Sequence, residues 1–85
     1  MKKVIRFTAP WCGPCRTVAP ILAEMAQKYS DKAIFQTVDI DNDPVTAKKY
    51  GVSSIPTVVI EVNGVETQRF VGVKPKNLYE SAINN

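Results

Sequence analysis

Two cysteines separated by two residues are the feature of this sequence best suited to chemistry. Cys12 and Cys15 are the only cysteines in the chain, and Gly13 and Pro14 stand between them. Two intervening residues on a helical turn bring the sulfur atoms close enough to bridge, and this spacing beside a β-α-β pattern is typical of a redox motif. Because the chain contains no histidine, it cannot form a Ser-His-Asp or Cys-His nucleophile or a histidine-ligated zinc centre.

Metal binding is the main chemical alternative for these residue types. Two cysteines cannot complete a tetrahedral zinc site within one chain, so only a site shared between two copies stays open. The spacing of Asp39, Asp41 and Asp43 is similar to the start of a calcium-binding loop. That loop needs a glycine where Pro44 stands and a bidentate glutamate where Tyr50 stands. We therefore interpret the aspartates as capping and solvated loop charges.

The elements on either side of the cysteines explain why this position matters. A β-rich segment, 4–8, leads into the motif, and apolar residues at helical spacing predict a helix over 14–29. The free N–H groups and the positive dipole end of that helix would stabilise a thiolate at Cys12. Pro14 is tolerated there because the first helical turn has no partner for its missing N–H.

The remainder of the chain predicts a small α/β domain with the order β-α-β-α-β-β-α. The first two strands need a helical crossover and are therefore parallel. Asn63-Gly64 predicts a hairpin, because its turn needs positive φ at both positions. The last helix begins at Pro75 and offers Leu78, Tyr79, Ala82 and Ile83 for packing. The other expected elements are a strand at 33–40, a short helix that Asp43 caps and Pro44 begins, and strands at 57–62 and 66–71.

Composition narrows the class of protein. Eighty-five residues, 45% hydrophobic and 22% charged, fit one folded domain over 1–85. The net charge of +3 is scattered and forms no basic stripe, so we expect no nucleic-acid role. No apolar run approaches the roughly 20 residues of a membrane span. The first residues lack the apolar core of a signal peptide, and a cysteine pair used for chemistry suits a reducing, cytoplasmic setting.

The motifs together closely resemble the thioredoxin family. The resemblance runs from about Val4 to Ile83 and combines five separate segments. These are Ala9-Pro10-Trp11-Cys12-Gly13-Pro14-Cys15-Arg16, then Ala19-Pro20, Val38-Asp39-Ile40-Asp41 with Asn42-Asp43-Pro44, Tyr50-Gly51-Val52 with Ser54-Ile55-Pro56-Thr57, and Phe70-Val71-Gly72.

The resemblance implies a thioredoxin-like α/β fold with a four-stranded mixed sheet in the order 2-1-3-4 and helices on both faces. It implies reduction of protein disulfides, with Cys12 as the exposed nucleophile and Cys15 as the deeper resolving thiol. No metal or organic cofactor is needed. The implied partners are disulfide-containing substrate proteins and a recycling, NADPH-dependent reductase acting on a monomer. Supporting roles at the site fall to Trp11, Gly13, Pro14, Ile55, Pro56 (in a cis peptide) and Gly72.

The chain departs from the family pattern in three places. It begins at what would be the second strand of the family, so the usual first strand and helix are missing. Arg6 stands where the family usually has a buried aspartate below the cysteines, and Thr37 stands where a lysine commonly partners it. Strand alternation puts Arg6 on one face, and Asp39 is the only acid on that face of the next strand. We therefore hypothesise an Arg6–Asp39 pair that favours the thiolate and raises the reduction potential.

Two other functions compete with this interpretation. A glutaredoxin-like, glutathione-dependent reductase fits the length, but that family typically carries Pro-Tyr between its cysteines and a Gly-Gly followed by acids near its last strand. Here Gly72-Val73-Lys74-Pro75 provides neither the second glycine nor the acids. The second alternative is a binding module without enzymatic activity. It would use the groove around Trp11, Pro56 and Gly72 to hold a partner protein.

Overall fold

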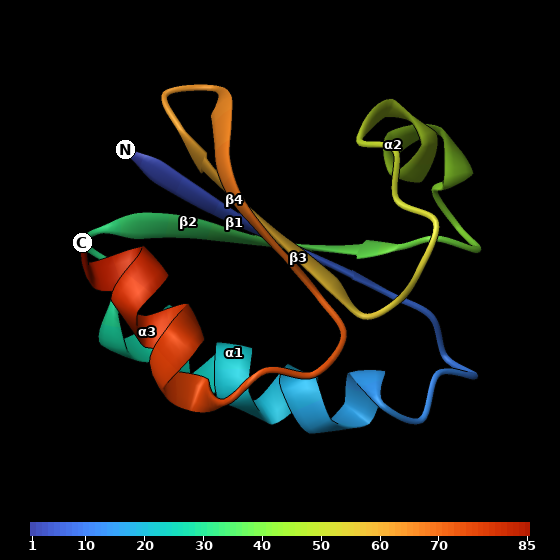
Figure 1. Cartoon of the computed structure of the whole chain (residues 1–85), viewed down its shortest axis with the longest axis horizontal. Coiled ribbons are helices and arrows are strands. Elements are labelled where there is room, and N and C mark those ends of the chain that lie inside the picture. Colours follow the sequence, from blue (N-terminus) through green and yellow to red (C-terminus); the bar gives the residue numbers. More distant parts are fainter.

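The computed structural model describes residues 1–85 and places a mixed sheet between helices (Figure 1). The predicted order of seven elements is confirmed, with boundaries close to those expected. The elements are β1 (Lys2–Thr8), α1 (Cys15–Lys28), β2 (Ala33–Asp39), α2 (Pro44–Lys49), β3 (Thr57–Val62), β4 (Val65–Val71) and α3 (Lys76–Asn84).

The sheet has the predicted topology. Its strands follow the order β2-β1-β3-β4, with β1 parallel to β2 and antiparallel to β3. Helix α1 makes the crossover that two parallel neighbours require. The hairpin between β3 and β4 turns at Asn63 and Gly64, whose φ angles are 52° and 85°. Both are positive, as a turn of this type demands.

The two faces of the sheet carry separate apolar cores. Helices α1 and α3 lie on one side of the sheet and α2 on the other (Figure 1). Side chains alternate along β1, so Val4 belongs to the first core and Ile5 and Phe7 to the second. The α1/α3 core has ten buried residues and the α2 core has five. The larger core also includes Val18, Leu22, Met25, Tyr29, Ala33, Val58, Ile60, Tyr79 and Ile83.

One packing prediction is wrong. Leu78 is 42% exposed, whereas its neighbour Tyr79 is fully buried and Ile83 almost so. Tyr79 and Ile83 lie four residues apart and share one face of α3, which is the face against the sheet. Leu78 is rotated by about 100° from Tyr79 around the helix axis, which turns it toward solvent.

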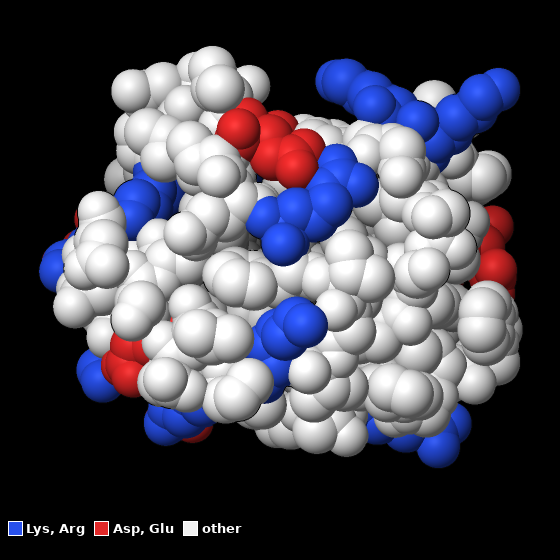
Figure 2. Space-filling view, viewed as in Figure 1, with Lys and Arg blue, Asp and Glu red and all other residues white.

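Both chain termini lie at the same end of the molecule (Figure 1), and ion pairs join α1 to α3. Lys28 pairs with Glu80 at 2.6 Å, and Lys76 pairs with Glu24 at 2.7 Å, joining α1 to α3. Lys2 donates to the carbonyls of Ala82 and Ile83 near the end of α3. On the face of the molecule seen in Figure 2, the basic side chains stand in separate groups, with acidic side chains among them. None of the helices has the length and apolar character that a membrane crossing requires.

Candidate active site

The cysteine motif lies where β1 gives way to α1, as predicted. Cys12 and Cys15 are joined by a disulfide, and their Cα atoms are 5.3 Å apart. Pro14 already has helical φ and ψ of −59° and −28°, and the helix begins at Cys15. Arg16 N–H donates to the Gly13 carbonyl at 3.0 Å, which closes the first turn around the motif. Gly13 and Pro14 are exposed.

The expected exposure of Cys12 is wrong for this oxidised state. Cys12 is 5% exposed and Cys15 is 2% exposed, so the two residues are almost equally covered. Both pack with Ala9 in a small apolar cluster, against the half-buried Ile40 and Ile55. The loops that end β2 and precede β3 therefore close over the disulfide.

Hydrogen bonding distinguishes the two sulfur atoms more clearly than burial does. The backbone N–H of Cys15 donates to Sγ of Cys12 at 3.2 Å. It is a free donor at the first residue of α1, where no intrahelical acceptor exists. A donor at the positive end of a helix stabilises negative charge on the atom it faces. The arrangement therefore favours charge on the Cys12 sulfur.

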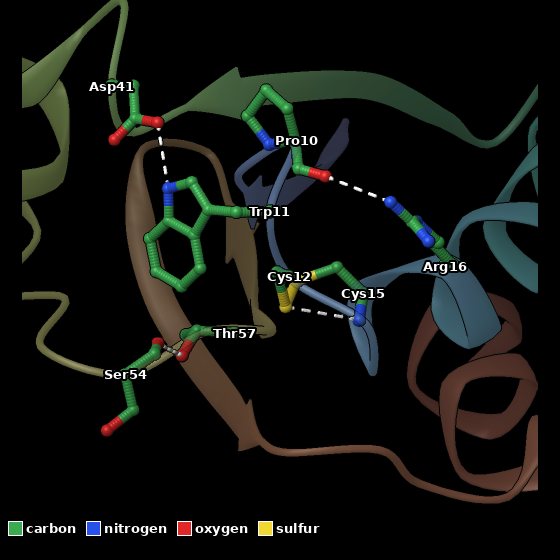
Figure 3. The surroundings of a disulfide bond; sticks show 8 residues. All are labelled: Pro10, Trp11, Cys12, Cys15, Arg16, Asp41, Ser54 and Thr57. Carbon is green, nitrogen blue, oxygen red and sulfur yellow. Dashed lines mark hydrogen bonds between the residues drawn. A yellow bond between two sulfur atoms is a disulfide. The ribbon is translucent and has the colours of Figure 1, made fainter.

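Trp11 is the exposed aromatic residue expected beside the cysteines. Trp11 is 66% exposed, and its indole Nε1–H donates to Oδ2 of Asp41 at 2.9 Å. In Figure 3, Trp11 and Arg16 flank the disulfide from opposite sides, with Arg16 turned toward the Pro10 carbonyl. The contact with Asp41 fixes the indole at the rim of the site.

Asp41 is the residue that the sequence interpretation did not assign to the site. The aspartate pattern of its loop predicts only a capping or solvated charge at this position. A signal was available, because parallel neighbouring strands end at the same edge of a sheet. The exit of β2 must therefore lie beside the exit of β1, where Trp11 follows.

The loop before β3 forms the facing wall of the site. The Ile55–Pro56 peptide is cis, as the resemblance implied. The N–H of Gly72 donates to the Pro56 carbonyl at 2.8 Å, and Gly72 has φ of 87°, which favours glycine. Thr57 Oγ1 donates to the Ser54 carbonyl at 2.6 Å and fixes the start of the strand. These bonds bring the end of β4 against the proline.

The hypothesised Arg6–Asp39 pair does not form. Arg6 lies opposite Thr37 in the parallel ladder and donates to its Oγ1 at 3.4 Å. Asp39 lies opposite Thr8, two residues farther along the β1–β2 ladder. Its carboxylate instead accepts from the N–H of Asp41 at 2.9 Å and from the side-chain amide of Asn42 at 3.4 Å. Asp39 therefore stabilises the loop that follows β2 and does not pair with Arg6. Partial burial lowers the pKa of Arg6.

With this geometry established, comparison with known proteins decides the family. The family model for thioredoxin matches residues 1–85. A thioredoxin of Bacillus subtilis is 44% identical over 78 residues, which covers 92% of this chain and 75% of that protein. The chain belongs to the thioredoxin family. It is a thiol–disulfide oxidoreductase with a redox-active cysteine pair.

Two further relatives show how far the likeness extends. The crystal structure of oxidised mitochondrial thioredoxin 3 from Saccharomyces cerevisiae has a TM-score of 0.88 and 35% identity, covering 98% of this chain and 76% of that one. An M-type chloroplastic thioredoxin of Brassica napus is 43% identical over 81 residues, covering 95% of this chain. The matched region is 46% of the length of the Brassica protein. The predicted fold and thioredoxin membership are confirmed.

Proposed function

We propose that this thioredoxin-family protein reduces disulfide bonds of substrate proteins, with Cys12 as the attacking thiol. In the reduced protein, the Cys12 thiolate attacks one sulfur of the substrate disulfide. A mixed disulfide forms between Cys12 and that sulfur, and the other substrate sulfur leaves as a thiolate that takes up a proton. The 3.2 Å bond from the Cys15 N–H to the Cys12 sulfur is the observation that supports this order most directly.

Cys15 then resolves the intermediate. Its thiolate attacks the Cys12 sulfur, the Cys12–Cys15 disulfide forms, and the second substrate sulfur leaves as a thiol. Two electrons pass from the protein to the substrate. The substrate ends with two thiols, and the protein ends in the oxidised form described above. No group beyond the two cysteines takes part in the electron transfer.

Substrate binding is assigned to the exposed surface beside the disulfide. Trp11 at one rim and the Ile55–Pro56 and Gly72 segments at the other border the covered sulfur atoms. Val71 and Val73 extend an exposed apolar surface from Gly72. An extended substrate segment would lie across this surface, contacting the backbone of Ile55.

A second partner is needed to return the protein to its dithiol state. We propose a flavoprotein reductase that carries electrons from NADPH, acting on a monomer in the cytoplasm. Support for a reducing compartment comes from the cysteine content, since both cysteines are used in one redox pair. The Brassica relative is named as chloroplastic, which describes that protein.

Turnover of a protein substrate with an interchain disulfide, with dithiothreitol as electron donor, tests the proposal. Wild-type protein should accelerate reduction, and Cys12→Ser should lower the rate to that of dithiothreitol alone. Ser30→Ala, an exposed substitution beyond α1, is the matched control and should keep full activity. An unchanged rate with Cys12→Ser would contradict the proposal. A Cys12→Ser/Cys15→Ser variant that still supports the biological role would favour the binding module.

A further inference from the structure

Arg6 carries a charge for which the protein provides no counter-ion. Its guanidinium is partly buried on the α1 side of β1, and the three ion pairs of the molecule involve other residues. Its one side-chain hydrogen bond is the long contact of 3.4 Å to Thr37. An arginine has five N–H donors in a planar fork, so most of its donors are left for another acceptor.

The guanidinium lines a groove of about 270 Å³ between α1 and the strands β1 and β2. Three alanines on α1 make one wall, and their small side chains leave the space open. Val4, Leu22 and Phe35 supply the remaining apolar surface. The polar lining consists of Arg6 with Gln36 and Thr37, so no acidic side chain lines the groove. The alanines are Ala19, Ala23 and Ala26.

We propose that this groove binds a small monocarboxylate with an apolar tail, its carboxylate on Arg6 and its tail along the alanine wall of α1. A planar guanidinium matches a carboxylate through two parallel hydrogen bonds. A single cation favours one negative charge, because a dicarboxylate or phosphate dianion would bring a second charge with no partner. The volume lies just below the usual range of about 300–1,000 Å³ for ligand pockets, which restricts the tail to a short chain or one ring.

The groove is distinct from the substrate surface. It lies on the α1/α3 side of the sheet, whereas Trp11, Ile55 and Gly72 surround the disulfide at the end of the strands. Ala19 is one helical turn beyond Cys15 on the same face of α1. A ligand in the groove would therefore rest against the helix that carries the dithiol. Its binding does not depend on thiol exchange and can be measured on the oxidised protein.

Titration of ¹⁵N-labelled oxidised protein with octanoate tests the proposal. We expect saturable amide shifts around Ala23, Phe35 and Thr37, with half-saturation on the order of 1 mM, which suits a ligand of this size. Acetate has the charge without the tail, and 1-octanol has the tail without the charge. Both should bind at least about tenfold more weakly, because each loses one of the two recognised groups.

Variants distinguish octanoate binding in the groove from a general effect of surface charge. Arg6→Gln should weaken octanoate binding about tenfold or more, because it removes a charged hydrogen-bond partner. Lys48→Gln makes the same change in net charge on the exposed face of α2 and should bind as wild type. Ala23→Leu keeps Arg6 and fills the groove from a surface position, so it should also weaken binding.

Several outcomes would overturn the proposal. They are shifts that fail to saturate up to about 10 mM octanoate, shifts centred outside the groove, or equal binding by Arg6→Gln or 1-octanol. The Ala23→Leu result keeps the test decisive if Arg6→Gln unfolds. If folded Ala23→Leu binds octanoate as tightly as wild type, the octanoate tail does not lie in the groove and the proposal is wrong. Loss of disulfide reductase activity would leave these binding results unaffected, so the two proposals fail independently.

Discussion

The two ends of the sheet are held together in different ways. At the end with the chain termini, α1 and α3 are joined by side-chain contacts over large sequence separations, including Lys28–Glu80 at 2.6 Å and the bond from Tyr29 to the same carboxylate. Apolar side chains such as Met25 are fully buried near these contacts. At the disulfide end no ion pair forms, and short backbone bonds shape the loops around Cys12.

The difference indicates that stability and chemistry are carried by separate parts of this small molecule. The disulfide end exposes Trp11 and uses a cis peptide and a positive-φ glycine, which give shape with little buried apolar area. The larger apolar core lies on the α1/α3 face of the sheet and includes Met25. Substitutions at one end should therefore change the free energy of unfolding, and those at the other should change reaction with substrate.

The largest expected effect is on stability, from Met25→Ala. Deleting a fully buried methionine side chain should lower the free energy of unfolding by about 2–5 kcal/mol. Urea unfolding followed by circular dichroism measures this change. The rate of substrate reduction by the folded protein should stay at the wild-type value. A proportional loss of that rate under conditions where the variant is folded would show that the two ends are not separate.

Tyr50→Phe tests a contact on the α2 face, behind the loop that holds Pro56. The Tyr50 hydroxyl donates to Oε2 of Glu61 at 2.6 Å, and Glu61 is only 8% exposed. Removing the donor leaves a covered carboxylate short of a partner and should cost about 1–3 kcal/mol of unfolding free energy. Tyr29→Phe is the matched control, because Glu80 keeps Lys28, and its loss should stay below about 1 kcal/mol.

The same contact predicts a pH dependence. The hydrogen bond to Glu61 raises the pKa of Tyr50 to about 12, above its ordinary value of 10.0. A raised folded-state pKa contributes stability that is complete below pH 10 and is lost as the pH rises toward 12. Unfolding free energies measured across this window should fall more steeply in wild type than in Tyr50→Phe. Parallel curves would contradict the assignment.

The Arg6→Gln variant tests whether the Arg6 charge changes the reduction potential of the cysteine pair. We predict that the Arg6 cation on the α1 side of β1, which has no acid paired to it, favours the thiolate and thus the reduced form. Its removal should lower the potential by about 30 mV, which is the equivalent of one pKa unit for a two-electron couple. Equilibration with a glutathione redox buffer measures the change, with Lys48→Gln as the charge-matched control. Equal shifts in the two variants would show a general charge effect.

The smallest effect is expected from Trp11→Phe. The variant keeps an aromatic ring at the rim but loses the exposed 2.9 Å bond to Asp41 that orients it, and this loss of positioning should lower kcat/KM for a protein substrate about fivefold. Asp41→Ala removes the same bond from the other side and should match it. Unfolding free energies should change by less than about 0.5 kcal/mol. A wild-type kcat/KM in both variants would remove Trp11 from the binding surface.

Local patterns were sufficient to predict most of the fold. The spacing from Val18 to Tyr29 identified α1, the Asn63-Gly64 pair identified the hairpin, and the Asp43 side chain does cap α2 by accepting from the N–H of Thr46. These signals depend on neighbours a few residues apart. Leu78 shows their limit, because an apolar residue near a helix start indicates burial only when its face is known.

Contacts across the sheet could not be predicted in the same way. Asp39 has the correct strand face for pairing with Arg6, but the choice of partner depended on register and on the free N–H groups of its own loop. The cover over Cys12 likewise depends on the two loops that contain Ile40 and Ile55. The redox role of the cysteine pair could be predicted from the sequence, because it depends on the spacing of the two cysteines and on the helix that follows them.

The most direct test of the account is to trap the intermediate with single-cysteine variants. Reduced Cys15→Ser mixed with a disulfide substrate should accumulate a mixed disulfide on Cys12, seen by intact mass and peptide mapping. Reduced Cys12→Ser should form adducts on Cys15 at least about tenfold more slowly, because its thiolate lacks the bond from the first helical N–H. Equal or faster adduct formation on Cys15 would contradict the assignment of Cys12 as the attacking thiol.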